Sequence, residues 1–211
     1  MSSPIDPAVL PAFLGAMVLV ELTPGPNMGY LAALSAERGR AAGFAAVLGV
    51  QLGLLAYLLA TLLGLTELML VWPAAYEALR WAGVAYLLWL AWDAWRGAEA
   101  GPDAHVLPPA SMARLVWRGF LANVLNPKAA LFYVTLLPAF IRPGFAPTGW
   151  QIALFGAGHL AVSAAVHGLI VLGAARAGTL ASRAAGSVRL RRTMAVGIAL
   201  IAAWLAWSTR R

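Results

Sequence analysis

The stretch Thr23-Pro24-Gly25-Pro26-Asn27 interrupts an apolar run that extends from Val9 to Ala36. Two prolines flanking a glycine cannot continue a helix, because proline lacks an N–H donor and its ring clashes with the preceding turn. Without the interruption the run would cross a bilayer, which takes roughly 20 residues of helix. We therefore predict a membrane helix that is broken near its middle.

A second break, Asn126-Pro127-Lys128, lies inside another apolar run, from Phe120 to Ile141. An unsatisfied backbone group in lipid costs several kcal/mol, so broken backbone is tolerated there only against protein or a wet cavity. Matched breaks in the two halves of a membrane protein are the best sequence pointer to a transport site. The two breaks therefore favour a small-solute transporter.

The composition is that of a membrane protein. Of 211 residues, 62% are hydrophobic and 11% are charged, whereas a soluble domain is closer to half apolar and a quarter charged. The net charge of +7 comes from Arg in short loops, which indicates positive-inside topology and not nucleic-acid binding. Cysteine is absent, so no disulfide or thiolate metal site can form.

The apolar runs predict an all-α integral membrane protein with six spans, of which the first and fourth are broken. The spans are Val9 to Ala36, Ala41 to Leu65, Ala74 to Trp95, Val116 to Ile141, Trp150 to Ala175 and Met194 to Trp207. Residues 1–100 then form one three-helix repeat, 101–114 a cytoplasmic linker and 115–211 a second repeat within one bundle. Three spans per half is an odd number, so the second repeat is inverted relative to the first.

The distribution of Arg predicts the orientation in the membrane. The first-to-second, third-to-fourth and fifth-to-sixth connections hold Arg38, Arg40, Arg96, Arg114, Arg118, Arg176, Arg183, Arg189, Arg191 and Arg192. The opposite side holds only Arg80, Arg142, Arg210 and Arg211. The positive-inside rule places the first set in the cytoplasm and both termini in the periplasm.

A new half-helix is expected to begin after each break. Proline is favoured at a first helical position, where Pro26 and Pro127 would lie, and Asn126 is suited to cap the second half-helix. Free N–H groups and the positive dipole end would suit a carboxylate. We predict a substrate site at the breaks, with a purely structural kink as the alternative; its residues are Thr23, Pro24, Gly25, Pro26, Asn27, Asn126, Pro127 and Lys128.

Two charges lie next to the breaks, Glu21 and Lys128. A charge at the bilayer centre costs at least ~2.5 kcal/mol and indicates function by default. We expect Lys128 to bind a carboxylate and Glu21 to bind an ammonium or carry a proton; alternatively, the two pair with each other.

The fifth span carries His159, Ser163 and His167 in steps of four, on one loose helical face. We assign His159 with Glu21 to proton or ion coupling, although such residues more often hydrogen-bond across helices. Two His in that span with no carboxylate there and no cysteine in the chain do not make a convincing metal site. We expect neither a metal nor a cofactor.

Small residues predict where helices approach closely. Gly39 and Gly43, and then Gly49 and Gly53, follow the spacing of small-residue packing faces. We therefore assign Gly43, Gly49 and Gly53 to helix packing. The pattern leaves open whether the partner helix is in the same chain or in a second copy, that is, a homodimer.

These residues resemble the LysE/RhtB family of amino-acid exporters. The resemblance rests on Thr23-Pro24-Gly25-Pro26-Asn27, Gly39-Arg40-Ala41-Ala42-Gly43, Gly49-Val50-Gln51-Leu52-Gly53, Leu79-Arg80-Trp81-Ala82-Gly83-Val84-Ala85-Tyr86-Leu87, Gly119-Phe120-Leu121-Ala122-Asn123-Val124-Leu125-Asn126-Pro127-Lys128-Ala129-Ala130-Leu131-Phe132 and Leu137-Pro138-Ala139-Phe140. These motifs cover most of the chain in the family's order, and they add Asn123 to the expected substrate site.

The resemblance implies a bacterial inner-membrane protein that exports amino acids or close derivatives by alternating access, driven by the proton gradient. The chain departs from the family pattern at Leu54, where members often carry an acid, and at Ala139, where they often carry Gln. Glu21 is a candidate to compensate for the missing acid. The alternatives are a divalent-cation exporter of related fold, a membrane scaffold, and an intramembrane enzyme that uses Ser163 with a histidine.

Overall fold

We describe the protein from a computed structural model of the chain. The structure describes residues 3–22, 26–64 and 111–184, together with single residues and short runs between 72 and 95 and between 192 and 203. Every regular element in these ranges is helical, and none of them is a strand. The predicted site residues Thr23, Pro24 and Gly25 lie outside the described residues, as does most of the third and sixth predicted spans.

The N-terminal half begins with a short 3₁₀ turn, η1 (Pro7–Val9), followed by α1 (Leu10–Leu22) and α2 (Pro26–Leu62). The backbone of α2 leaves helical geometry at Gly39, where φ is 79°. A Cβ atom added to Gly43 would collide with Ser35 Oγ, so the chain reverses at Gly39 and its two arms lie side by side. Glycine takes this left-handed conformation at no steric cost.

The C-terminal half contains α5 (Met112–Val124), α6 (Pro127–Leu131), the π-type turn η2 (Phe132–Leu136), the 3₁₀ turn η3 (Pro138–Phe140) and α7 (Thr148–Ala184). The chain bends by 54° between α5 and the segment that follows it. The predicted end of the fifth span at Ala175 is wrong. The alanine-rich sequence that follows has high helix propensity, so Arg176 and Arg183 lie on α7 and not in a loop.

The helices suit a bilayer in length and in surface. In the described part of the chain, Asn27–Leu62 and Thr148–Thr179 are long and apolar enough to cross a membrane, and the bent pair Met112–Val124 with Pro127–Phe140 is a third. One face of α2 exposes large apolar side chains every three or four residues, namely Phe44, Leu48, Leu52, Leu55, Leu59 and Leu62. Such a stripe is suited to lipid. The protein is an α-helical membrane protein, whereas six spans in inverted repeats remain a prediction.

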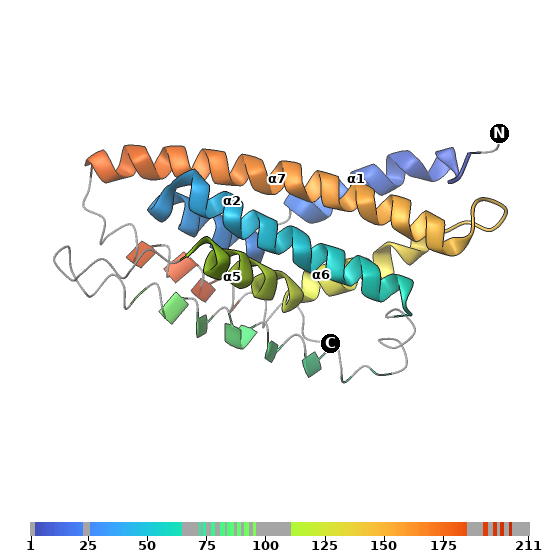
Figure 1. Cartoon of the computed structure of the whole chain (residues 1–211), viewed down its shortest axis with the longest axis horizontal. Coiled ribbons are helices and arrows are strands. Elements are labelled where there is room, and N and C mark those ends of the chain that lie inside the picture. Colours follow the sequence, from blue (N-terminus) through green and yellow to red (C-terminus); the bar gives the residue numbers. More distant parts are fainter. Residues whose placement is uncertain are drawn as a thin grey trace.

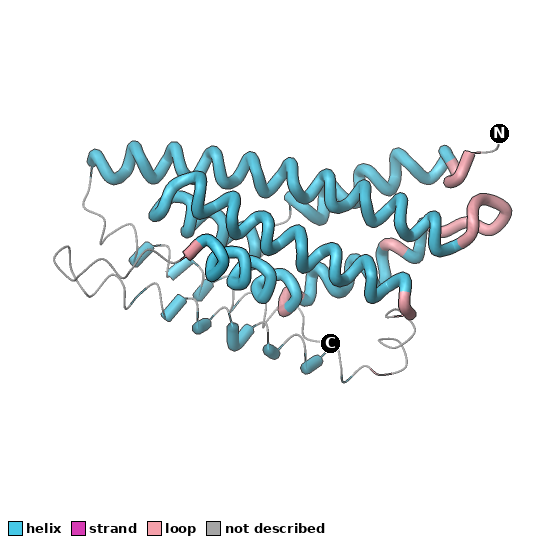
Figure 2. Tube along the Cα trace, viewed as in Figure 1, coloured by secondary structure: helices cyan, strands magenta, loops and turns pink. Residues whose placement is uncertain are grey.

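The second arm of α2 lies between α5 and α7 (Figure 1). It runs antiparallel to α7, because Leu58 meets Gly156 near one end and Gly43 meets Val171 near the other. It runs parallel to α5, where Gly49 lies against the backbone of Val116 and Phe120. Figure 2 shows that the described loops are confined to the ends of the helices and to the α5–α6 break.

Two apolar clusters fill the bundle at different heights. The Phe13 cluster contains Val9, Phe13, Met17, Leu54, Tyr57, Leu58, Ala129, Ala130, Phe132, Tyr133, Leu137 and Phe155. The Leu31 cluster contains Tyr30, Leu31, Leu34, Ala42, Ala46, Val47, Val84, Ala91, Leu115, Ala122 and Val171. Seven buried polar side chains lie between the two clusters along α1–α2, α5–α6 and α7, and we call them the polar layer: Glu21, Asn27, Asn123, Asn126, His159, Ser163 and His167.

The two ends of the bundle differ in charge. The N-terminal segment meets the turn after η3, where Ala146 N donates to Pro4 O over 3.1 Å. The opposite end carries the Gly39 turn, the start of α5 and the end of α7 (Figure 1), and with them Arg38, Arg40 and Arg176. This grouping fits the predicted charge asymmetry, and which end faces the cytoplasm stays a prediction.

We predict that Gly49→Ala destabilises the bundle. The added Cβ would meet backbone atoms of Val116 and Phe120, which cannot swing aside, so the expected loss in unfolding free energy is about 1–3 kcal/mol. Gly173→Ala on α7 is the matched control, because a Cβ there meets nothing within 4 Å. Thermal unfolding in detergent measures both variants, and equal melting temperatures would contradict the close α2–α5 contact.

Candidate functional site

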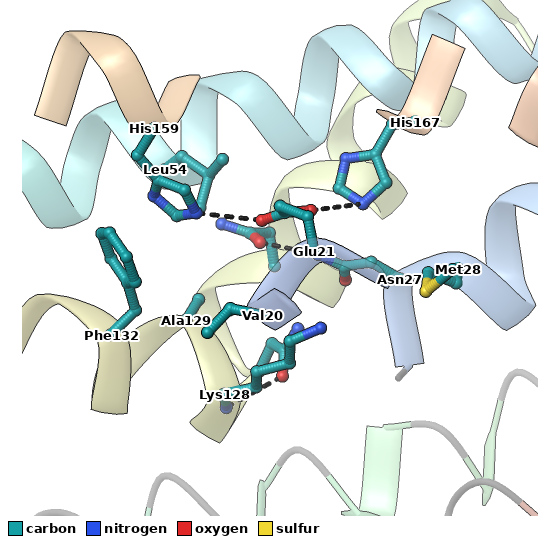
Figure 3. Close-up of a pocket in the computed structure, with 12 residues that line it drawn as sticks. Val20, Glu21, Asn27, Met28, Leu54, Lys128, Ala129, Phe132, His159 and His167 are labelled. Atoms are coloured by element: carbon teal, nitrogen blue, oxygen red, sulfur yellow. Dashed lines mark hydrogen bonds and ion pairs between the residues drawn. The ribbon is translucent and has the colours of Figure 1, made fainter. Parts of the chain in front are cut away.

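A small cavity, partly open to the outside, lies where the two broken helices meet α7 (Figure 3). The space inside it is about 20 Å³, room for roughly one water molecule, so a larger ligand requires the surrounding helices to move apart. It is lined by Val20, Glu21, Asn27, Met28, Leu54, Asn123, Asn126, Lys128, Ala129, Phe132, His159 and His167. Residues from both predicted breaks therefore border one cavity.

The carboxylate of Glu21, near the C-terminal end of α1, lies between two imidazoles of α7. Its Oε1 atom is 2.9 Å from His159 Nε2, and its Oε2 atom is 3.5 Å from His167 Nε2. Glu21 is 6% exposed, and a buried charge is tolerated only where it is paired and hydrogen-bonded. The two histidines supply those partners, one for each carboxylate oxygen.

Each imidazole has a hydroxyl behind it. His167 Nδ1 is 3.0 Å from Ser163 Oγ, and His159 Nδ1 is 3.4 Å from the hydroxyl of Tyr133. Beyond Ser163, the side-chain amide of Gln51 on α2 lies 3.4 Å from Oγ. The result is a buried chain of polar contacts that runs from η2 through α7 and α1 to α2.

Asn27 and Asn123 form the second polar feature of the cavity. Asn27 Nδ2 donates to Asn123 Oδ1 over 2.7 Å, and both side chains are buried. Within the described part of the chain, no hydrogen-bond partner reaches the two remaining atoms, Asn27 Oδ1 and Asn123 Nδ2. Buried polar atoms are almost always paired, so this pair presents one acceptor and one donor for a ligand.

The start of α6 does not have the free N–H groups expected from the sequence. Asn126 is the cap, as expected, and its Oδ1 atom accepts from Lys128 N over 3.0 Å. Its backbone carbonyl accepts from Ala129 N and Ala130 N at 3.0 and 3.2 Å. The expectation that this terminus offers free donors to a carboxylate is therefore wrong, because Asn126 occupies them.

Lys128, the only lysine of the chain, is half-buried and lines the cavity. It interacts electrostatically with Glu21. In the view of Figure 3, Glu21 lies between the two histidines on one side and Lys128 on the other. The cavity thus holds a carboxylate enclosed by imidazoles and, separately, a cation.

The structure brings six of the predicted site residues to this cavity: Glu21, Asn27, Asn123, Asn126, Lys128 and His159. Pro26 and Pro127 begin α2 and α6, and Pro127 does not line the cavity. Gly43 and Gly49 lie at helix contacts, and Gly53 lies directly against the side chain of Asn123. These positions are now observed, whereas the functional roles assigned to them remain predictions.

Four members of the polar chain were not assigned to the site from the sequence, namely Gln51, Tyr133, Ser163 and His167. His167 shares the helical face of His159, and its spacing was the available signal. Tyr133 gave no signal in an apolar run, because its direction depends on the π-type turn, where Leu137 N donates to Phe132 O over 2.8 Å. Such turns occur often at functional sites.

No group of three or more His, Asp or Glu residues in the described part of the chain is arranged to hold a metal ion. His159 Nε2 hydrogen-bonds to Glu21 Oε1, and His167 Nε2 lies at an ion-pair distance of 3.5 Å from Glu21 Oε2. Those are the atoms that a metal would require, and cysteine is absent.

The helices and the buried cavity define a helical membrane protein with a polar site enclosed between broken helices. The family model of the LysE type translocator matches residues 18–208, and the chain belongs to this family. The match confirms the resemblance drawn from the motifs.

Several known proteins are similar to the chain in sequence. A homoserine/homoserine lactone efflux protein of Salmonella typhimurium is 36% identical over 63% of this chain and 64% of its own length. A cysteine/O-acetylserine efflux protein of Salmonella choleraesuis is 29% identical over 71% of this chain and 74% of its own. An uncharacterized membrane protein of Pseudomonas aeruginosa is 34% identical over 63% and 64%. The chain thus spans somewhat less than two thirds of the first relative, and no solved structure matches it.

We predict that Asn126→Ala lowers the unfolding free energy by about 1 kcal/mol, the usual cost of losing a helix cap. Asn126→Ser should keep most of that stability, because a serine hydroxyl can also accept from Lys128 N. Thermal unfolding of both variants in detergent measures the difference. Equal destabilisation by Ala and Ser would show that the cap contact does not hold the break.

Proposed function

We propose that the protein is a secondary carrier that exports amino acids or close derivatives across the bacterial inner membrane. Family membership and the printed names of two relatives, both efflux proteins, support the class. The observation that carries the proposal for this chain is the buried Asn27–Asn123 pair, which lines the cavity between the breaks and leaves one acceptor and one donor without a partner in the described part of the chain.

The Asn pair suits a ligand that has both an amine and a carboxylate. A buried donor or acceptor without a partner costs about 1–3 kcal/mol, which a bound ligand recovers. We assign the ammonium of the substrate to Asn27 Oδ1, and its carboxylate to Asn123 Nδ2 and the ammonium of Lys128. Glu21 is not assigned to the substrate amine, because two histidines already occupy its oxygens.

The position of the polar layer supports alternating access. The Phe13 cluster lies toward one end of the bundle, and the Leu31 cluster lies toward the other. In the proposed cycle the two clusters open in turn around a fixed site. The proposal includes two inverted three-helix repeats at 1–100 and 115–211, joined by the cytoplasmic linker 101–114, with both termini in the periplasm.

The proposed coupling ion is a proton carried by Glu21 and His159. An ionisable residue inside a membrane protein marks a proton or substrate pathway by default, and a histidine can exchange a proton near neutral pH. Leu54, where the family often has an acid, lines the same cavity as Glu21. Glu21 therefore supplies, from α1, the acid that α2 lacks.

A carrier fits this site better than an enzyme does. Ser163 and His167 are within hydrogen-bond distance, but Ser163 is fully buried and does not line the cavity. A nucleophile must reach its substrate. The same hydroxyl is well placed to position His167.

Asn123→Ala is expected to raise the KM for the exported amino acid about 10- to 100-fold. A hydrogen bond to a charged group contributes about 1.5–3 kcal/mol, and each 1.4 kcal/mol is a factor of ten. Uptake into inside-out membrane vesicles measures KM directly. Ser35→Ala is the matched control, because Ser35 Oγ is also buried and unpartnered among the described residues but lies outside the cavity. An unchanged KM in Asn123→Ala would remove the Asn pair from the site.

Lys128→Ala is expected to abolish export while the protein stays in the membrane, because the substrate carboxylate loses its counter-charge. Host cells are loaded with a panel of dipeptides, and the free amino acids that appear outside are measured. Arg176→Ala, which removes an exposed cation from α7, should export normally. Normal export by Lys128→Ala would exclude Lys128 from the site, and no export of any amino acid by the native protein would contradict the function.

A further inference from the structure

The hydrogen bonds around Glu21 define where protons lie in the cluster. An ionised carboxylate only accepts hydrogen bonds, so each Nε2 atom that faces Glu21 carries a hydrogen. A neutral imidazole with its proton on Nε2 has an acceptor at Nδ1. The hydroxyls of Ser163 and Tyr133 face those two Nδ1 atoms and donate to them. In this arrangement the two hydroxyls donate to the imidazoles, and the imidazoles donate toward Glu21.

A proton added to this cluster can bind to either of two equivalent nitrogen atoms. It binds Nδ1 of His159 or of His167, and the neighbouring hydroxyl rotates to accept the new N–H. A hydroxyl can make this change because it has both a donor and acceptor lone pairs. A proton on Glu21 itself would instead set an O–H against an Nε2–H and lose one of the two imidazole contacts.

The charges of the surrounding elements limit the cluster to one proton. With both imidazoles neutral, the net charge of Glu21, His159 and His167 is minus one, and one added proton brings it to zero. A second would leave two imidazolium ions beside one carboxylate in a buried space, with Lys128 of α6 nearby. Like charges repel strongly where water is excluded. Among the described residues, the titratable groups that interact with the cluster are Lys128 and Tyr133; the α2 neighbours Asn27 and Gln51 do not titrate.

We propose that Glu21, His159 and His167 form one binding site for a single proton, held on either imidazole, with Ser163 and Tyr133 as positioning residues. The proposal rests on the function proposed above for its role in transport. It adds His167 and a stoichiometry of one to the coupling site.

The same site connects proton binding to the helices that must move. Glu21 belongs to α1, which ends at the first break, and both imidazoles belong to α7. The hydrogen bond from a neutral imidazole to the ionised Glu21 carboxylate is already charge-assisted, and protonation of the imidazole adds the Coulomb attraction between two opposite charges where water is largely excluded. Binding of the proton therefore tightens α1 against α7, and its release loosens the contact.

Nitrogen-15 NMR of labelled histidine in the purified full-length protein tests the site without requiring transport. His105, the third histidine of the chain, is removed by His105→Gln so that two imidazoles remain. At high pH both should be neutral with hydrogen on Nε2, and acidification should add one proton to the two combined. Two independent protonations, or hydrogen on Nδ1 at high pH, would overturn the proposal.

Glu21→Gln provides a second prediction of the same geometry. A glutamine amide offers one acceptor and one donor, so it can no longer accept from both Nε2 atoms. One imidazole should move its hydrogen to Nδ1, while the other keeps it on Nε2. Ser163→Ala should alter the Nδ1 signal of His167 alone, and Ser35→Ala should alter neither histidine. If both imidazoles keep their hydrogen on Nε2 in Glu21→Gln, the two histidines do not share the Glu21 carboxylate and the proposal is refuted. If Glu21→Gln folds poorly, the comparison of Ser163→Ala with Ser35→Ala provides the test.

Transport by the native protein in proteoliposomes separates the two proposals. One proton moved per amino acid exported, together with the NMR result, supports both the carrier function and the single-proton site. The NMR result with no amino-acid transport contradicts the carrier function and leaves the proton site standing. Transport with two protons per substrate contradicts the single-proton site and leaves the carrier function standing.

Discussion

The burial of the Glu21 carboxylate constrains the rest of the bundle. A lone carboxylate between apolar clusters would be expelled, so α1 can end there only if partners reach it. They come from α7, which presents His159 and His167 to the two oxygens at 2.9 and 3.5 Å. Those two residues in turn require hydroxyls at their far nitrogens, which brings in Ser163 and the π-type turn that carries Tyr133.

Glycine contacts make this arrangement possible in a thin polar layer. Gly49 and Gly53 on α2 let α5 approach until the side chain of Asn123 touches the α2 backbone. That approach brings Asn123 within 2.7 Å of Asn27, across the gap between the two halves of the chain. Close packing and an unsatisfied amide pair thus occur at the same place. The same glycines would stabilise any helix contact, but here they also fix the shape of the cavity.

Much of the fold and of the candidate site could be predicted from the sequence, because the effects of proline, glycine and buried charge are local. The breaks, the Asn126 cap and the closeness of Glu21, Asn27 and Lys128 follow from rules of one helix turn or one span. The occupancy of the α6 N–H groups is a consequence of that cap which was not drawn from the sequence, since Pro127 has no N–H and Asn126 accepts from the next three donors. Tyr133 did not follow from these rules, because a π-type turn changes the face on which later residues lie. The sequence could not decide whether Lys128 or the histidines are the partners of Glu21, because that depends on how α1 packs on α7.

An acid at position 21 lies on a different helix from an acid at position 54, and its protonation therefore acts on a different part of the bundle. Leu54 lies on the continuous second arm of α2, packed between α5 and α7, where a change of charge would act on a rigid helix. Glu21 lies one residue from the end of α1, beside the break. A proton bound by the histidines beside Glu21 changes the contact of the C-terminal end of α1 with α7. In the proposed carrier, protonation therefore acts directly on the half-helix that borders the substrate cavity, so no separate relay is needed between the proton site and the moving part.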